Sequence, residues 1–343
     1  MPRYNDGDNA VIVNSDALTG YTGHRLCAIN GGKMEDRLAQ FRTNTLLSFD
    51  RWIEVDETMV IAPAQRELNA WGDIEQLGFI HDLGGIGITE TKWAIQGDTS
   101  PANVAMDLET RGIEGAVDFE MDRAPVPIIY KDIQINTRLL AASRNGGEPL
   151  DVTNIAAGSR KVAIAAEDML VKGYSGSLGG QTIYGYTNHP DRIIVTGFEL
   201  TPFDISNAEN MIIAMLEAGN RNQYRGSAYL YIPGGYGPSL SRRWGDGGGS
   251  SDTLGSWLEQ IKLVEKVTTT DSLDPGNMLL VYMSPENIDI AKGLPLEPIE
   301  WEERGGMVNK IRVLMAAVPR LKKRRAFNGG YQVGVVHMRF QGA

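Results

Sequence analysis

The clearest pattern of apolar and polar positions lies within residues 126–173. In its first part Ile129, Ile133 and Ile135 fall on one face at a period of two, and more polar side chains alternate with them. Such alternation is typical of a strand with one buried face. The chain then passes through Asn145-Gly146-Gly147, where we expect the strand to have ended.

A long helix is predicted after Pro149. Asp151 or Thr153 can cap its first turn, and Gly173 supplies the residue at which it stops. Helical spacing gives it an apolar seam of Ile155, Val162, Ala163, Ala166, Met169 and Leu170. The opposite face is polar enough to meet solvent or another subunit, and consists of Arg160, Lys161, Glu167, Asp168 and Lys172.

Shorter patterns predict further elements along the chain. A helix is expected through Trp52, kinked by Pro63, and its apolar face continues through Trp71 and Ile74. A second helix should follow the capping sequence at residues 201–204, with a buried face of Ala208, Met211, Ile212, Met215 and Leu216. Strands are predicted at residues 193–196, 229–232, 278–283, 311–318 and 331–338, and a short helix at 254–261.

Residues 93–123 are loosely alternating and strongly acidic. They carry Asp98, Asp107, Glu109, Glu114, Asp118, Glu120 and Asp122 against only Arg111 and Arg123. A segment this long with little apolar surface is typical of a β-hairpin or loop that projects from its domain. Because like charges repel, we expect it to contact a cationic neighbour rather than fold back on its own chain.

The dense basic cluster of the chain is the run Arg320, Lys322, Lys323, Arg324 and Arg325, which we call the basic run. Its composition fits a nucleic-acid contact, a solvated turn or a contact with the acidic segment. A second distinctive loop is the glycine-rich stretch 234–251. So many glycines cost conformational entropy unless packing fixes them, so we expect this stretch to be mobile in the isolated subunit.

Composition narrows the class of protein. A chain of 343 residues, 42% hydrophobic and 22% charged, can bury a sizeable core in one large or two modest domains. The formal net charge of −10 does not attract nucleic-acid phosphates, so any polyanion contact must be local. Cys27 is the single cysteine, which excludes an intrachain disulfide. Because no apolar run approaches the ~20 residues of a membrane span, we expect a soluble cytosolic product without a membrane partner.

No residue set in the sequence points to catalysis. The histidines His24, His81, His189 and His337 have no metal-binding spacing. Gly247-Gly248-Gly249 lacks the lysine and the following helix that a phosphate-binding loop needs. We therefore predict no catalytic, cofactor-binding or metal-binding residues and no cofactor, and a cytosolic hydrolase is the remote alternative.

The order of these features resembles that of encapsulins and tailed-phage major capsid proteins, which share the Hong Kong ninety-seven-type fold. The resemblance rests on the strand, the Pro149-Leu150-Asp151 turn, the helix at 161–170 and its exit through Gly173-Tyr174-Ser175-Gly176. It extends upstream to residues 47–56 and downstream to Thr201-Pro202, and it covers most of residues 47–343.

The resemblance implies an α+β fold with a definite division of the chain. Its expected parts are an N-terminal arm at residues 1–48, a helical segment at 49–92, an extended β-hairpin loop at 93–126, a peripheral domain with a long spine helix at 127–195, an axial α/β domain at 196–310, and return strands of the peripheral domain at 311–343. The long helices disfavour an all-β jelly-roll capsid.

The function implied is that of a structural major capsid protein of a bacteriophage, which self-assembles into an icosahedral shell enclosing viral double-stranded DNA. Such a chain would form pentamers and hexamers in the host cytoplasm and reside in the virion capsid. Scaffolding, decoration and portal proteins are the further partners implied, with weak non-specific contact to DNA. The alternative is an encapsulin nanocompartment enclosing a cargo enzyme; the long polar N-terminal arm and the larger axial domain favour the phage.

The resemblance also implies roles for the two charged segments. The extended loop of this fold reaches over a neighbouring subunit, so Asp98, Asp107, Glu109, Glu114, Asp118 and Glu120 of one subunit are expected to meet the basic run of the next. The rival interpretation is that the basic run faces the packaged genome. The glycine-rich stretch is expected near a symmetry axis, with Arg242, Arg243 and Trp244 bordering an opening.

We predict that shells of this protein are not covalently crosslinked through the extended loop. Some relatives join a loop lysine to a neighbour's asparagine, but no lysine occurs here between Lys92 and Lys131. Denaturing electrophoresis of mature particles should therefore show the monomer band. A ladder of multimers that resists boiling and reductant would contradict this prediction.

Overall fold

The computed structural model describes residues 5–6, 9–10, 61–95, 97, 120–136, 153–199, 205–242, 253–303, 308–325 and 330–341. Contacts between residues divide the chain into two compact units, which are described separately. Unit 1 takes Met1–Glu67, Ile128–Ile164 and Leu294–Met315, and unit 2 takes Leu68–Pro127, Ala165–Gly293 and Ala316–Ala343. These units are not the domains expected from the sequence, whose bounds remain a prediction.

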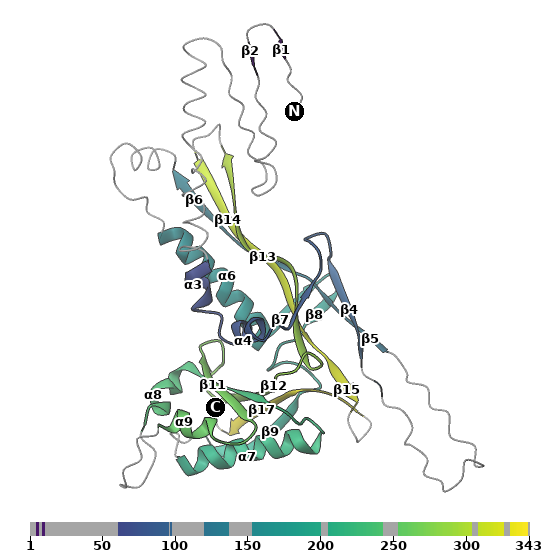
Figure 1. The fold of residues 1–343 in the computed structure, drawn as a ribbon, viewed down its shortest axis with the longest axis vertical. Coiled ribbons are helices and arrows are strands. Elements are labelled where there is room, and N and C mark those ends of the chain that lie inside the picture. Colours follow the sequence, from purple (N-terminus) through teal and green to yellow (C-terminus); the bar gives the residue numbers. More distant parts are fainter. Residues whose placement is uncertain are drawn as a thin grey trace, which may run out of the picture. The chain divides into compact units, whose positions relative to one another are not determined.

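The described elements are labelled in Figure 1. The helices are α3 (Ala62–Gln65), α4 (Ala70–Gln76), α6 (Thr153–Val171), α7 (Ile205–Arg221), α8 (Gly237–Leu240), α9 (Leu254–Glu259) and the 3-10 turn η3 (Gly234–Tyr236). The strands are β1 (Asn5–Asp6), β2 (Asn9–Ala10), β3 (Ile80–Asp82), β4 (Glu90–Ile95), β5 (Glu120–Pro125), β6 (Ile128–Asn136), β7 (Tyr174–Leu178), β8 (Gln181–Ile183), β9 (Ile193–Glu199), β10 (Ala228–Pro233), β11 (Val264–Thr270), β12 (Asn277–Tyr282), β13 (Ile288–Glu303), β14 (Val308–Leu321), β15 (Lys323–Arg325), β16 (Tyr331–Val333) and β17 (Val335–Gln341).

A four-stranded sheet runs in the order β3, β13, β14, β6, and β6 with residues 294–303 of β13 and 308–315 of β14 belongs to unit 1. On β6, Ile133 is buried while Asp132 and Gln134 on either side of it are exposed, which confirms the alternation predicted there. Gly158 of α6 packs directly against Ile133, because a Cβ on this glycine would meet the Ile133 side chain. The helix therefore approaches the sheet closely at a residue without a side chain.

The other face of this sheet carries an arginine held between two aromatic rings. Arg312 donates from Nε and Nη2 to the two carboxylate oxygens of Asp132, at 2.5 and 2.7 Å. Its guanidinium carbon lies 4.7 Å from the ring centre of Tyr130 and 5.1 Å from that of Trp301. The hydrogen bonds from Arg312 lower the pKa of Asp132.

The predicted long helix is α6. All six residues of its expected apolar seam are buried, and the helix is followed by Gly173, whose φ is +74°. A left-handed backbone conformation at this position favours glycine, so the stop signal in the sequence was correct. The predicted polar face is confirmed at Arg160 and Lys172, whose side chains are 57% and 42% exposed and pair with Glu67 and Asp274.

Glu167 is the exception, because the prediction that it faces solvent or another subunit is wrong. It is 1% exposed and accepts hydrogen bonds from Ala70 N at 2.8 Å, Trp71 N at 3.0 Å and the Thr270 hydroxyl at 3.1 Å. The carboxylate thus satisfies the free amides at the start of α4, which has no cap of its own at Asn69. Burial raises the pKa of Glu167 to about 7, although these hydrogen bonds oppose the shift.

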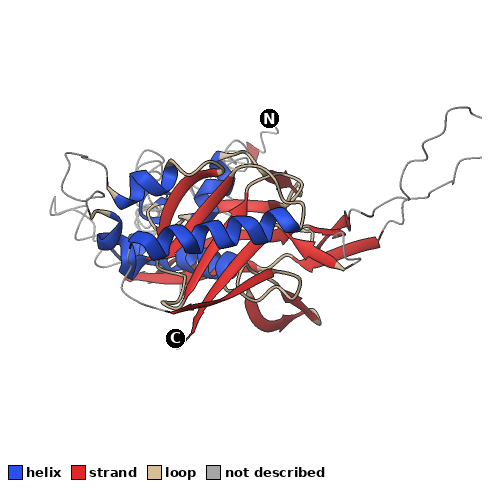
Figure 2. Cartoon of the chain, turned by 90° about the horizontal axis from the view of Figure 1, so that it is seen from below, coloured by secondary structure: helices blue, strands red, loops and turns tan. Residues whose placement is uncertain are grey.

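Unit 2 contains a five-stranded sheet in the order β11, β10, β12, β17, β9. Helix α7 lies along one face of this sheet, and in Figure 2 it is the long blue helix that crosses the red strands. All five predicted buried residues of α7 belong to the core cluster on this face, together with Leu230, Leu280 and Val336 from the strands. The apolar spacing therefore predicted this helix and its buried side correctly.

The last strand, β17, pairs antiparallel with β12 and parallel with β9, inside this five-stranded sheet. The resemblance predicts return strands of the peripheral domain here, whereas β17 lies in one sheet with β10, β11 and β12. Val335, Val336 and Met338 are all buried. Burial of successive residues means that both faces of β17 are covered, as is typical of an interior strand.

The base of the extended loop is a β-hairpin. Strands β4 and β5 pair antiparallel from Glu90 opposite Pro125 to Ile95 opposite Glu120. Residues 98–119, with Asp98, Asp107, Glu109, Glu114 and Asp118, lie outside the described residues, as do the N-terminal residues 11–60 and the capping sequence 201–204. Pro63 sits in the first turn of α3, where its missing amide costs no hydrogen bond.

We predict that Gly185→Ala destabilises the subunit. A Cβ there would meet Gly173 N and lie 2.7 Å from Leu170 O, and these atoms are backbone that cannot move aside. The adjacent amides of Tyr186 and Thr187 also bond the last carbonyls of α6, so the strain would reach the helix end. Urea unfolding of dissociated subunits should show a free energy of unfolding lower by about 3 kcal/mol.

The matched control is Gly87→Ala. A Cβ at Gly87 would meet nothing within 4 Å. Its free energy of unfolding should stay within about 0.5 kcal/mol of the unsubstituted protein. Equal effects of the two substitutions would contradict the close approach at Gly185.

Candidate assembly site at the base of the hairpin

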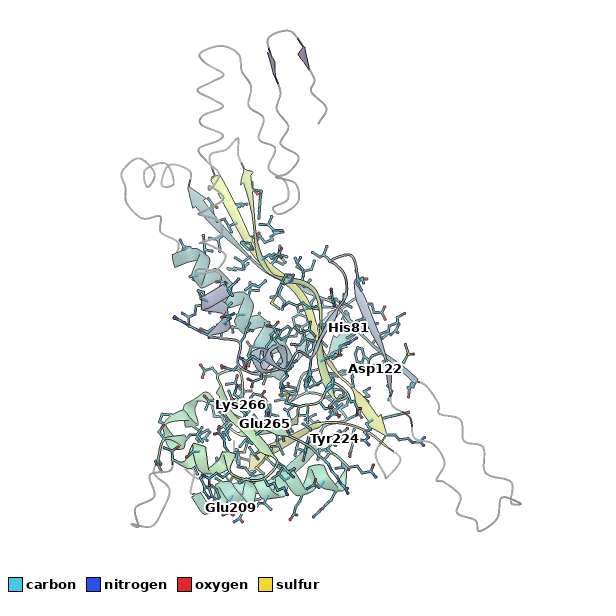
Figure 3. All side chains as sticks on the ribbon, in the orientation of Figure 1. His81, Asp122, Glu209, Tyr224, Glu265 and Lys266 are labelled. Carbon is cyan, nitrogen blue, oxygen red and sulfur yellow. The ribbon has the colours of Figure 1, made fainter. Side chains whose placement is uncertain are left out.

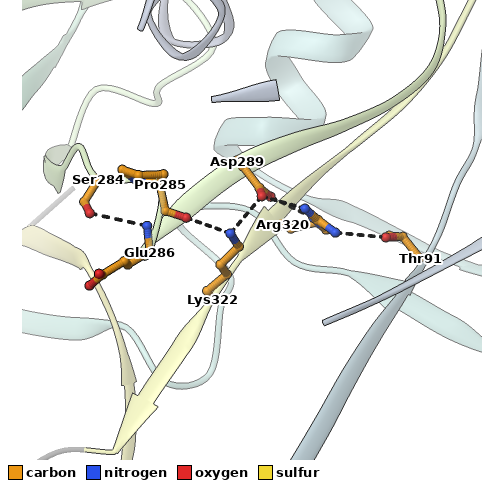
Figure 4. Close-up of polar contacts among 7 residues, drawn as sticks. All are labelled: Thr91, Ser284, Pro285, Glu286, Asp289, Arg320 and Lys322. Carbon is orange, nitrogen blue, oxygen red and sulfur yellow. Dashed lines mark hydrogen bonds and ion pairs between the residues drawn. The ribbon is translucent and has the colours of Figure 1, made fainter. Parts of the chain in front are cut away.

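The basic run begins with a buried arginine at the end of β14. Arg320 donates from Nε and Nη2 to the carboxylate oxygens of Asp289, at 2.7 and 2.5 Å, and from Nη1 to the Thr91 hydroxyl at 3.1 Å (Figure 4). The side chains of Arg320 and Asp289 are 4% and 9% exposed. The guanidinium carbon also lies 5.7 Å from the ring centre of Trp93. Arg320 is therefore enclosed by its own chain.

The two lysines of the run are also paired within the chain. Lys322 Nζ lies 2.8 Å from the Asp289 carboxylate and donates to the Pro285 carbonyl at 2.6 Å (Figure 4). Lys323 Nζ lies 3.2 Å from Asp122, which Figure 3 labels, and 3.5 Å from Asp191. Burial lowers the pKa of Lys323, but the two carboxylates outweigh it and the net shift is upward.

Three cations thus face three carboxylates of the same subunit. The acidic segment was expected not to fold back on its own chain, yet Asp122 at its base pairs with Lys323. Among the described residues, Arg324 and Arg325 are the two members of the run for which no ion pair is found, and Arg325 is exposed. Glu120 is also exposed. Arg242 is exposed at the end of α8, and Arg243 and Trp244 lie outside the described residues.

A buried histidine network lies next to this cluster. Arg192 Nε donates to His337 Nδ1 at 3.0 Å, which leaves the ring proton on Nε2 to reach Asn277 Oδ1 at 2.9 Å. The Asp191 amide donates to His189 Nδ1 at 3.1 Å. Burial lowers the pKa of both histidines to about 4, so both are neutral at pH 7.

The paired charges of this cluster hold neighbouring strands together. A cavity of about 350 Å³ beside the run is lined by Trp93, Ala94, Pro285, Glu286, Lys322 and Lys323. Its two ammonium groups are already bound to carboxylates, and the lining contains no nucleophile with a base beside it. In the described part of the chain, no group of three or more His, Cys, Asp or Glu is placed to bind a metal. No described helix is both long and apolar enough to cross a membrane.

Several known structures with similar folds come from capsids or a virus-like particle. The virus-like particle from Pyrococcus furiosus has a TM-score of 0.55 and 14% identity, covering 81% of this chain and 99% of its own. The capsid of Myoviridae Phage XM1 has a TM-score of 0.56 and 13% identity over 77% of this chain and 90% of its own. The capsid of a native GTA particle has a TM-score of 0.50 and 12% identity over 81% and 90%. The chain therefore has the α+β Hong Kong ninety-seven-type capsid fold, as the sequence predicted.

The family of the chain is defined by sequence as well as by fold. Residues 42–298 match the model described as "Family of unknown function (DUF6260)", and the chain belongs to that family. None of the curated proteins compared with the chain matches it in sequence.

Sequence reasoning identified the basic run but missed the carboxylates that pair with it. Asp289 and Asp191 lie 31 and 132 positions from Arg320 and Lys323, so no local pattern joins each pair. One signal was present in the sequence. Asp289 and Arg320 are each a single charged residue within an apolar segment, in Ile288-Asp289-Ile290 and Val318-Pro319-Arg320-Leu321. Isolated opposite charges in two buried strands are the pattern expected of a buried ion pair.

We predict that acid destabilises the subunit through the histidine network. With its pKa lowered in the folded state, His337 contributes stability above about pH 6.5 that is lost as the pH falls through about 4, because the unfolded chain binds the proton more readily. Between pH 6.5 and 4.5 this group alone should cost about 2 kcal/mol of unfolding free energy.

The comparison is with His337→Gln, which keeps an acceptor for Arg192 and a donor for Asn277 but does not titrate. Urea unfolding of both proteins at pH 6.5 and 4.5 isolates the histidine from other acid-sensitive groups. The substituted protein should lose about 2 kcal/mol less than the unsubstituted one over this range. Equal losses would show that His337 keeps its ordinary pKa.

Proposed function

We propose that this chain is a structural shell protein that self-assembles into a closed icosahedral capsid enclosing double-stranded DNA, as the major capsid protein of a tailed phage. The observation that supports it most is the extent of the structural likeness. Shell proteins are matched over 90–99% of their own length, so the likeness takes in nearly the whole of each shell protein. The paired charges at the hairpin base support a holding role rather than a catalytic one.

The second candidate is an encapsulin nanocompartment enclosing a cargo enzyme. It is supported by the virus-like particle of Pyrococcus furiosus, which this chain resembles about as closely as it resembles the phage capsid. We favour the phage because residues 1–48 form a long polar arm in the sequence, in addition to the parts that encapsulins share. Pentamers and hexamers of one chain, with scaffolding, decoration and portal proteins as further partners, belong to this proposal.

Electron microscopy of the purified protein tests the shell. Negative-stain images and sedimentation should show closed particles of uniform size, and particles from infected or induced cells should protect DNA from nuclease. Particles that protect no DNA but carry a second protein would favour the nanocompartment. Protein that stays monomeric across salt, pH and concentration would overturn the shell proposal.

We further propose how neighbouring copies recognise one another. The acidic hairpin of one copy, with Glu120 at its described base and Asp98, Asp107, Glu109, Glu114 and Asp118 beyond it in the sequence, contacts Arg324 and Arg325 of the next. These are the two cations of the run for which the described residues supply no ion pair. Arg320, Lys322 and Lys323 are left out of this contact because carboxylates of their own chain already hold them. Arg242, Arg243 and Trp244 are proposed to border the opening at a symmetry axis.

We predict that Arg324→Gln with Arg325→Gln weakens assembly without changing subunit stability. An exposed ion pair contributes only about 0 to 1 kcal/mol, so one subunit is little affected, but the loss recurs at every interface of a closed shell. Particle yield should fall and become more sensitive to salt. Urea unfolding of dissociated subunits should remain within about 0.5 kcal/mol of the unsubstituted protein.

The matched control is Lys322→Gln with Lys323→Gln, which removes two positive charges from the residues directly before Arg324 and Arg325. Because these lysines neutralise Asp289, Asp122 and Asp191, their loss should lower the unfolding free energy of the subunit itself. If empty shells of the Arg324 and Arg325 variant form normally and only DNA retention suffers, the contact between copies is wrong and the run faces the genome.

A further inference from the structure

The two strands of the hairpin are each tied to the basic run at their described base. On β4, Thr91 and Trp93 lie on the same face, and both contact Arg320. On β5, Asp122 accepts the ammonium of Lys323. Trp93 and Asp122 are direct partners in the ladder between the two strands. Arg320 and Lys323, three residues apart, therefore contact the paired residues Trp93 and Asp122 of the hairpin, and Arg320 also contacts Thr91.

These ties differ from the other contacts of the hairpin base. Thr91 is 3% exposed, and Arg320 reaches it while both Asp289 oxygens hold the guanidinium in place. On the outward side, Lys92 is exposed and Arg123 lies 3.7 Å from Glu90, with 62% of its side chain exposed. An exposed pair at that distance contributes little, whereas a buried bidentate pair has one geometry.

Lys323 also connects the hairpin to a second part of the chain. It lies between Asp122 on the hairpin and Asp191 in the turn before β9. That turn is itself fixed, because Arg192 donates to the His189 carbonyl and to the His337 ring on β17. The hairpin base is thus connected through side chains to an interior strand of the five-stranded sheet.

We infer that Arg320 and Lys323 are positioning residues, which act within their own subunit to fix the direction in which the hairpin leaves it, so that its acidic part reaches a neighbouring copy. This inference rests on the proposed shell function and deepens it. It assigns the first half of the basic run to holding the hairpin of the same chain, and leaves Arg324 and Arg325 for the contact between copies.

The test removes the two hairpin groups that contact Arg320 and Lys323 and leaves the basic run unchanged. Thr91→Val deletes the hydroxyl that Arg320 binds, while the pair with Asp289 stays. Asp122→Asn removes the hairpin carboxylate that pairs with Lys323, while the ion pair between Lys323 and Asp191 remains. The matched control is Lys92→Gln with Arg123→Gln, which alters the outward side of the same two strands. Hydrogen exchange of dissociated subunits and particle yield are measured for the variant, for the control and for the unsubstituted protein.

In the Thr91→Val, Asp122→Asn protein, amides of residues 90–95 and 120–124 should exchange roughly tenfold faster, a change equal to about 1.4 kcal/mol of local opening. The five-stranded sheet should exchange as before, and the yield of closed particles should fall at least several-fold. The control should change neither exchange nor yield. Thr91→Ser, which keeps the hydroxyl, should restore the exchange rate of β4 when it replaces Thr91→Val.

Two results would overturn the inference. Unchanged exchange at the hairpin base would show that the two cations do not hold it, and faster exchange with normal particles would show that the hold does not serve assembly. Failure of unsubstituted protein to form particles is a separate result, which overturns the shell proposal and removes the assembly role with it. Exchange on subunits would then still decide whether the ties hold the hairpin.

Discussion

The buried ion pair between Arg320 and Asp289 imposes the strongest constraint on unit 2. Taking each charge out of water costs several kcal/mol, and their attraction offsets this only when the geometry is good and the remaining hydrogen-bonding groups are filled. Here both carboxylate oxygens accept hydrogen bonds from the guanidinium, the Thr91 hydroxyl accepts one from Nη1, and Lys322 adds a second cation. The end of β14, the start of β13 and strand β4 must therefore come together in one arrangement. The pair contributes specificity of structure more than net stability.

The same rule governs Glu167 and Asp73. Glu167 accepts hydrogen bonds from the free amides at the start of α4. Asp73 accepts a hydrogen bond from the Tyr231 hydroxyl at 2.9 Å and pairs with Lys266. With its pKa raised to about 7 by burial, Glu167 contributes stability that is present below about pH 4.5 and lost as the pH rises toward 7. The buried histidines titrate with the opposite sign over nearly the same range. These contributions partly cancel, which flattens the dependence of stability on pH between about 4 and 7.

Internal neutralisation also shapes how copies of the chain can associate. A net charge of −10 makes like subunits repel, and salt shortens the reach of that repulsion to about 8–10 Å. Because Arg320, Lys322 and Lys323 are matched by carboxylates of their own subunit, they attract a neighbour weakly. In the shell that we propose, association depends on the charges for which the described residues supply no ion pair and on apolar area, repeated at every symmetric contact.

The sequence by itself determined the elements whose signal is local. The seam and the glycine stop of α6, the buried face of α7 and the alternation of β6 are set by residues within a few positions of each other, so periodicity was sufficient to find them. Their order along the chain also identified the fold class. Tertiary structure alone decided the rest. Glu167 accepts a hydrogen bond from an amide 97 positions away, and Arg320 donates to a hydroxyl 229 positions away. Strand β17 enters a sheet whose first strand in the sequence, β9, begins at residue 193. A polar side chain looks solvent-facing in a one-dimensional pattern because the pattern cannot show which distant element packs on it. Whether its charge is solvated, paired with its own chain or left for a neighbour is therefore fixed only when the chain has folded.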